Sequence, residues 1–98
     1  MRLRYTIPAL ADLDSILAYI ATRSPQGAAR VQQRIRDTVQ LLAEFPRIGT
    51  WTKDPSIRRL VARPYPYLIF YEVTESEVVI HAIRHGSRDP STMPGSTT

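Results

Sequence analysis

Apolar residues recur at intervals of three and four along two segments of the N-terminal half, and this periodicity predicts two helices. The first segment begins at Pro8, a residue suited to the first turn of a helix. The second begins at Ser24-Pro25, an N-cap hydroxyl followed by a proline. We therefore expect helices at residues 8–22 and 24–44, joined so closely that they form an antiparallel hairpin. The residues expected on the inner faces are Leu10, Leu13, Ile16, Leu17 and Ile20 in the first helix and Ala28, Val31, Ile35, Val39 and Leu42 in the second.

After Phe45-Pro46 the hydrophobic period changes from that of a helix to that of a strand. Three segments rich in β-branched and aromatic residues predict an antiparallel meander: residues 57–63, 67–74 and 77–84. A short extended segment at residues 3–6 predicts a strand before the helices, and a polar loop is expected to carry Trp51. The order β-α-α-β-β-β indicates an α+β fold in which the helical hairpin packs on one face of an antiparallel sheet. The other face has no obvious cover.

Length and composition narrow the class of protein. A chain of 98 residues is expected to form one domain, which we place at residues 1–90, with residues 91–98 as a mobile tail rich in Ser, Thr and Pro. The absence of cysteine excludes disulfides, a thiol nucleophile and a zinc site built on cysteine. No apolar segment suits a signal peptide or a membrane span, so we expect a cytoplasmic protein.

The basic charge is concentrated in one part of the chain. The formal net charge is +4, and all of this excess comes from residues 46–71, which contain a single acidic residue, Asp54. The basic residues of this segment are Arg47, Lys53, Arg58, Arg59 and Arg63. Such a segment suits an acidic partner, either a nucleic acid or an acidic polypeptide, but it also fits an ordinary solvated strand. Aromatic residues nearby favour nucleic acid, although Phe70 and Tyr71 are expected mainly to pack in the core.

Candidate chemistry is sparse. His81 and His85 are four residues apart on a strand, where that spacing gives no shared face, so we expect no metal site. His85 is the more accessible of the two because it follows the last strand. The chain has no phosphate-binding glycine loop and no nucleophile elbow, and we expect no cofactor. Metal-free RNA cleavage needs acid–base groups and cations, and five residues could supply them if they converge: Arg58, Arg63, Tyr71, Arg84 and His85.

A series of short motifs follows in a fixed order along the chain. The motifs are Ala11-Asp12-Leu13 with Ile16 and Tyr19-Ile20, Ser24-Pro25 with Ala28-Ala29, Leu42 with Phe45-Pro46-Arg47-Ile48-Gly49, Ile57-Arg58-Arg59-Leu60, Tyr65 to Tyr71, and Val79-Ile80 leading to Ile83 through Pro90. Each motif is weak alone, but their order and spacing over about residues 2–90 resemble the RelE/ParE toxins of bacterial type II toxin–antitoxin systems. The resemblance implies the RelE fold and neutralisation by an antitoxin encoded beside the toxin.

Two activities occur among toxins of this kind. ParE-like members poison DNA gyrase, whereas RelE-like members cleave mRNA on the ribosome. The extension past His85 into Gly-Ser-Arg-Asp-Pro, the single lysine and the long helical hairpin favour the ParE type, with DNA gyrase as target and a ParD-like antitoxin as partner. No catalytic residue is assigned on that interpretation. The candidates for binding the target or the antitoxin are Arg58, Arg59, Arg63, Arg84, His85 and Arg88.

Two alternatives remain open on the sequence. The first is a RelE-like, ribosome-dependent mRNA endonuclease that uses the five-residue set named above. The second is a basic nucleic-acid-binding or interaction module without toxicity. The first predicts cuts in translated message that depend on His85, and the second predicts normal growth when the chain is expressed.

Overall fold

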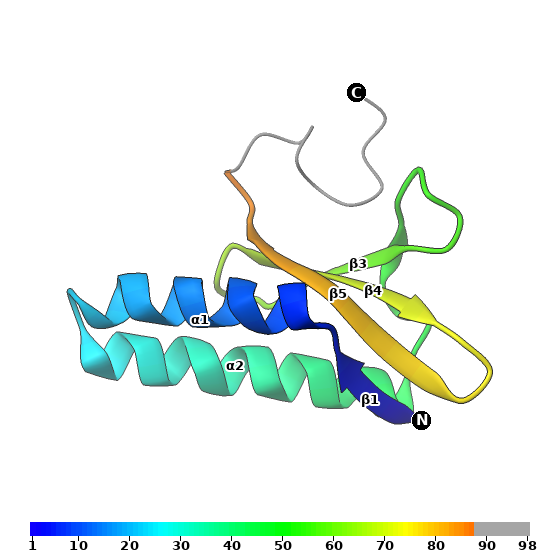
Figure 1. The fold of residues 1–98 in the computed structure, drawn as a ribbon, viewed down its shortest axis with the longest axis horizontal. Coiled ribbons are helices and arrows are strands. Elements are labelled where there is room, and N and C mark those ends of the chain that lie inside the picture. Colours follow the sequence, from blue (N-terminus) through cyan, green and yellow to red (C-terminus); the bar gives the residue numbers. More distant parts are fainter. Residues whose placement is uncertain (88–98) are drawn as a thin grey trace.

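The structure is a computed structural model that describes residues 1–87, which form two helices and five strands (Figure 1). Both predicted helices are confirmed to within one residue at each end. The predicted tail at residues 91–98 and the candidate Arg88 lie outside the described residues. The elements are β1 (Arg2–Tyr5), α1 (Ile7–Ala21), α2 (Pro25–Glu44), β2 (Thr50–Trp51), β3 (Arg58–Val61), β4 (Tyr67–Val73) and β5 (Glu77–His85).

Side-chain hydroxyls fix where the two helices begin. The Thr6 Oγ1 atom accepts a hydrogen bond from Ala9 N at 3.2 Å, and Ser24 Oγ accepts one from Gly27 N at 2.9 Å. Each cap satisfies a backbone donor that the first helical turn leaves without a partner. A proline follows each cap within the first turn, at a position where its missing N–H costs nothing.

The sheet has the strand order β1-β5-β4-β3-β2. Strands β3, β4 and β5 form the predicted antiparallel meander, which confirms the α+β fold class. However, β1 pairs with β5 in parallel, with Leu3 opposite Val78, so the sheet is mixed and the expectation of a wholly antiparallel sheet is wrong at this edge. The helical hairpin and three further strands separate β1 from β5 along the chain, so no tight turn forces the two strands to run in opposite directions.

The second departure is β2, which lies inside the segment expected to be a loop. Thr50 pairs with Arg59 and Trp51 pairs with Arg58 in antiparallel register. A strand of two residues is too short to show the alternation that reveals longer strands. Gly49, just before β2, donates its N–H to Tyr71 Oη at 2.9 Å and so holds the start of this strand against the core.

The main core lies between the helical hairpin and the face of the sheet that the hairpin covers (Figure 1). Val31, Ile35, Val39 and Leu42 of α2 are buried there, as predicted. Leu10 is 48% exposed, so its predicted place in the core is wrong. On the other face, Ile57, Phe70 and Ala82 form a smaller buried cluster. Phe70 and Tyr71 are both fully buried, which confirms that they pack in the interior.

Candidate functional site: a groove between α1 and β5

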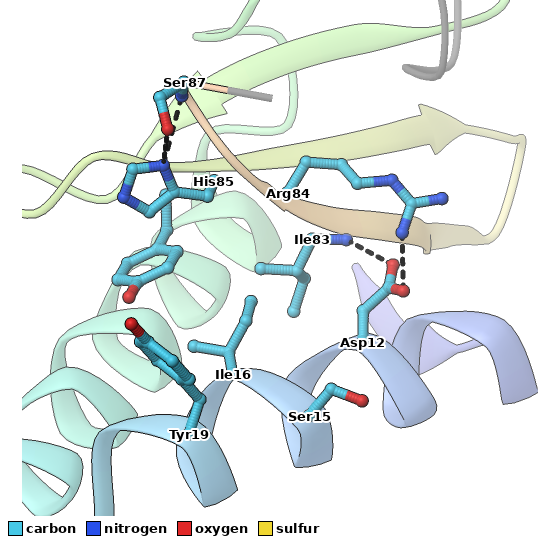
Figure 2. Close-up of a pocket in the computed structure, with 9 residues that line it drawn as sticks. Asp12, Ser15, Ile16, Tyr19, Ile83, Arg84, His85 and Ser87 are labelled. Carbon is cyan, nitrogen blue, oxygen red and sulfur yellow. Dashed lines mark hydrogen bonds and ion pairs between the residues drawn. The ribbon is translucent and has the colours of Figure 1, made fainter. Parts of the chain in front are cut away.

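An open pocket of about 560 Å³ lies between α1 and the C-terminal end of β5 (Figure 2). We call it the α1–β5 groove. It combines apolar and aromatic side chains with a few polar groups, the composition expected of a site that binds another molecule. The residues that line it are Asp12, Ser15, Ile16, Tyr19, Tyr67, Ile83, Arg84, His85 and Ser87.

Asp12 joins the helix side of the groove to the strand side. The parallel pairing of β1 with β5 ends where Tyr5 meets Ile80, so the next part of the β5 edge has no neighbouring strand among residues 1–87. Asp12 Oδ2 accepts a hydrogen bond from Ile83 N at 3.0 Å, and its Oδ1 is 2.5 Å from Arg84 Nη1 (Figure 2). One carboxylate therefore satisfies a strand-edge donor and neutralises a guanidinium that is only 26% exposed.

Arg84 is only partly satisfied by this ion pair. Its Nε atom is buried and has no hydrogen-bond partner among residues 1–87. A buried donor without a partner costs free energy, so the ion pair with Asp12 satisfies this side chain only in part.

His85 is oriented by the residues that follow it. Ser87 donates its backbone N–H to His85 Nδ1 at 3.1 Å, and Ser87 Oγ lies 2.7 Å from the same atom (Figure 2). Because Nδ1 accepts from a backbone N–H, the neutral imidazole carries its hydrogen on Nε2. The Tyr67 ring packs against His85 edge to face, with centroids 5.4 Å apart. His85 therefore offers Nε2–H as a fixed donor.

Two tyrosines supply the aromatic surface of the groove. Tyr67 is buried in the core, and burial together with the neighbouring Tyr19 raises its pKa above the usual value. Tyr19 is 62% exposed and rises from α1 into the groove, while the Arg23 guanidinium lies 5.0 Å from its ring centroid (Figure 2). The aromatic part of the groove thus presents phenol hydroxyls that can donate or accept hydrogen bonds.

Metal chemistry has no support in residues 1–87, where no three His, Asp or Glu side chains gather in a way that could hold an ion. Across the same residues, no helix is long and apolar enough to cross a membrane. The groove instead presents apolar surface with fixed donors at Arg84 and His85. This arrangement suits a polypeptide segment that carries both apolar and acceptor groups.

Comparison with known proteins identifies the family to which the chain belongs. The family model for the ParE toxin of the type II toxin–antitoxin system parDE matches residues 3–90. The chain belongs to the ParE toxin family. The ParE match runs from the second residue of β1 to beyond the end of β5. The comparisons give no support to the non-toxic module considered from the sequence.

Individual relatives of this ParE chain agree with the assignment. Protein Y4kP of Sinorhizobium fredii, which is named as a toxin, is 42% identical over 84 residues that cover 86% of each chain. Toxin RelE2 of Caulobacter vibrioides is 40% identical over 84 residues, covering 86% of this chain and 93% of the relative. A chain in the structure of the chromosomal ParDE toxin–antitoxin system from P. aeruginosa matches with a TM-score of 0.73 at 28% identity, covering 87% of this chain and 95% of that one.

The ParE fold divides the residues singled out from the sequence between two places. Arg84 and His85 line the groove and lie opposite Leu68 and Tyr67, near the start of β4. Arg63 is exposed in the adjacent turn, where its backbone carbonyl accepts a hydrogen bond from Arg34 Nε.

The remaining candidates lie further along the sheet. Arg58 pairs with Tyr71, three or four residues along β4 from the groove positions, which corresponds to about 10–13 Å. Arg59 is exposed and has no place in the groove.

The five residues proposed for RNA cleavage therefore do not converge. Tyr71 is fully buried, and its Oη accepts a hydrogen bond from Gly49, so its hydroxyl is a core contact. The Arg58 Nη1 atom donates to the carbonyl oxygens of Arg47 and Gly49, at 3.1 and 3.0 Å. Arg58 thus fastens the turn before β2 onto β3. Burial of Tyr71 follows from its inward position on the central strand β4, which the sequence had already indicated.

Several groove residues were missed by reasoning from single segments. Asp12 appeared only within a family motif, although its partner is Arg84, 72 residues away. Tyr19 appeared within a family motif without a role, and Ile16 was expected only to pack on the inner face of the helix. The available signal was an apolar helix with a large aromatic on its outer side, and such a helix requires a partner.

Proposed function

We propose that this ParE-family toxin inhibits DNA gyrase, as ParE-like toxins do. The observation that carries the proposal is the match of the ParE toxin model to residues 3–90. The geometry supports it indirectly, because the residues that would cleave RNA lie in two separate places and one of them, Tyr71, is buried.

The target is tested with purified toxin added to gyrase and relaxed plasmid in the presence of ATP. We expect supercoiling to be blocked or cleaved DNA to accumulate. The same preparation is added to a translation extract, where message is expected to stay intact. Undisturbed supercoiling at a large molar excess of toxin would contradict the proposal.

The competing RelE-like activity keeps one specific observation in its favour. A relative 40% identical to this chain is named Toxin RelE2. Ribosome-dependent cleavage would produce cuts at defined codon positions, and these cuts should disappear in a His85→Ala variant. Cuts that persist in this variant would show that His85 is not required.

We also propose that a ParD-like antitoxin neutralises the toxin by occupying the α1–β5 groove. The helix α1 supports this assignment, because its only polar side chains besides the phenol of Tyr19 are Asp12, Asp14 and Ser15. Its exposed residues include Ile7, Leu10 and Tyr19. Exposed apolar surface of this kind indicates a protein interface. An antitoxin segment with apolar anchors and acceptor groups would cover Tyr19 and accept a hydrogen bond from His85 Nε2.

A further inference from the structure

The only tryptophan of the chain is held in an exposed position on the edge strand β2. Trp51 is 59% exposed, and the guanidinium carbon of its cross-strand neighbour Arg58 lies 3.8 Å from its ring centroid. Because Arg58 is itself fixed by the carbonyl oxygens of Arg47 and Gly49, the indole rests on an anchored cation. Trp51 is thus a rigid aromatic platform that the core does not use.

A second pocket, of about 320 Å³, opens beside this platform. Its lining includes Arg47, Trp51, Ser56, Arg58 and Glu72. It lies near the C-terminal end of β4, about 17 Å along that strand from the groove position at Tyr67. We call it the Trp51 pocket, and it shares no lining residue with the α1–β5 groove.

Two groups in the Trp51 pocket have unused binding capacity. The Arg47 guanidinium has no hydrogen-bond or ion-pair partner within residues 1–87. Glu72 Oε1 lies 2.9 Å from His81 Nε2, while its second oxygen, Oε2, has no partner in the same part of the chain. The pocket therefore combines an aromatic face, an available cation and an available acceptor.

We propose that the Trp51 pocket binds one nucleotide of a single-stranded nucleic acid. In this arrangement the base stacks on Trp51, the Arg47 guanidinium contacts a flanking phosphate, and Glu72 accepts a hydrogen bond from the edge of the base. An exposed aromatic ring beside cations is the usual means of holding single strands. The pocket also lies in the segment that supplies the basic excess of the whole chain.

The acceptor at Glu72 favours a nucleic acid over an acidic peptide. An ionised peptide carboxylate has no hydrogen-bond donor to offer Glu72, whereas a base amino group such as N4 of cytosine donates to it. Thymine presents a carbonyl oxygen at the corresponding position, so the pocket is expected to prefer cytosine. This inference does not depend on the identity of the toxin's target.

The fluorescence of Trp51 tests the proposal directly, because no other tryptophan contributes. Purified toxin, without gyrase or antitoxin, is titrated with a deoxycytidine octamer and with a thymidine octamer. We expect the emission to be quenched by both and at lower concentration by deoxycytidine. Fluorescein-labelled octamers then report affinity for the variants by anisotropy, and circular dichroism checks that each variant is folded.

Each variant has its own expected effect. Trp51→Ala should weaken binding about tenfold, and Trp51→Phe, which keeps an aromatic ring, should weaken it less. Arg47→Ala should lower the slope of log affinity against log salt by about one. Glu72→Gln should abolish the preference for deoxycytidine, because its amide can also donate to thymine. Arg30→Ala, an exposed arginine of α2 outside the pocket, is the matched control and should bind as wild type does.

Three results would overturn the inference. If the labelled octamer binds, but the emission of Trp51 does not change and Trp51→Ala binds as tightly as wild type, the chain binds polyanions without using the pocket. A poly-glutamate peptide that quenches as strongly as deoxycytidine would show that the pocket takes acidic peptides. Absence of any binding at low salt would show that the pocket holds no nucleotide.

Discussion

Asp12 shows how much one side chain contributes to the candidate site. Replacing it by Asn removes the charge that neutralises Arg84 and leaves a mostly buried guanidinium without a counter-ion. We expect Asp12→Asn to lower the free energy of unfolding by about 1–3 kcal/mol in urea denaturation.

The matched control for Asp12 is Asp14→Asn, on an exposed position of the same helix where no contact with Arg84 exists. It should change stability by no more than about 0.5 kcal/mol. If the two substitutions lowered stability equally, the ion pair between Asp12 and Arg84 would add no more to stability than any acidic residue on α1.

Gly49 is required by close packing against Tyr71. A Cβ atom at this position would lie 2.5 Å from Tyr71 Oη and 2.9 Å from the carbonyl oxygen of Arg59. We expect Gly49→Ala to cost about 1–3 kcal/mol of stability, measured by urea denaturation. Adding Tyr71→Phe, which deletes the nearer oxygen, should recover part of that loss, and strictly additive effects of the two changes would contradict the account.

At the scale of elements, the two helix caps differ in the number of elements that they contact. Ser24 Oγ serves only the first turn of α2, whereas Thr6 Oγ1 caps α1 and also donates to the carbonyl oxygens of Ile80 and His81 on β5. We expect Ser24→Ala to cost about 1 kcal/mol and Thr6→Ala to cost more, as measured by thermal or urea unfolding. A smaller loss for Thr6→Ala would show that its contacts with β5 are unimportant.

The strands β1 and β4 make the fold sensitive to alkaline pH. Burial raises the pKa of Tyr5, Tyr67 and Tyr71 above the ordinary value near 10. The folded chain therefore keeps protons that the unfolded chain releases, so this contribution to stability is complete below pH 10 and is lost as the pH rises through the folded-state pKa values.

Urea denaturation at a series of pH values checks this behaviour. The unfolding midpoint should fall as the pH rises above about 10, and the fall should be smaller in Tyr71→Phe, although that variant is less stable at neutral pH because Gly49 N loses its acceptor. An identical decline in the variant and the wild type would contradict the role given to Tyr71.

Elements with strong local signals were predictable from the sequence, and the others depend on distant partners. Pro8 and Ser24-Pro25 sit beside periodic apolar residues, so both helices were placed correctly. Pairing of β1 with β5 is not encoded near Leu3, and two residues at Trp51 cannot show a strand period. The candidate site was predictable to the same extent. His85 could be selected from its position at a strand end, whereas the role of Asp12 depends on its contact with Arg84, which only the tertiary structure shows.

At the scale of the whole molecule, β4 carries two surfaces near its opposite ends. The groove near Tyr67 is apolar with fixed donors, and the Trp51 pocket near Glu72 lies in the basic segment. Because the two share no lining residue, substitutions in one are expected to leave the other intact. Trp51→Phe should therefore be neutralised by antitoxin like the wild type, and loss of neutralisation in a growth assay would show that the two surfaces act together.

The most direct measurement of the central claim is gyrase supercoiling in the presence of toxin and increasing amounts of its cognate antitoxin. We expect wild-type toxin to block supercoiling and antitoxin to restore it. Tyr19→Ala should still block supercoiling but need about ten times more antitoxin, because an exposed aromatic anchor of the groove is gone. Leu41→Ala, an exposed leucine of α2 outside the groove lining, should behave as wild type. Supercoiling that proceeds unhindered at a large excess of wild-type toxin would contradict the account.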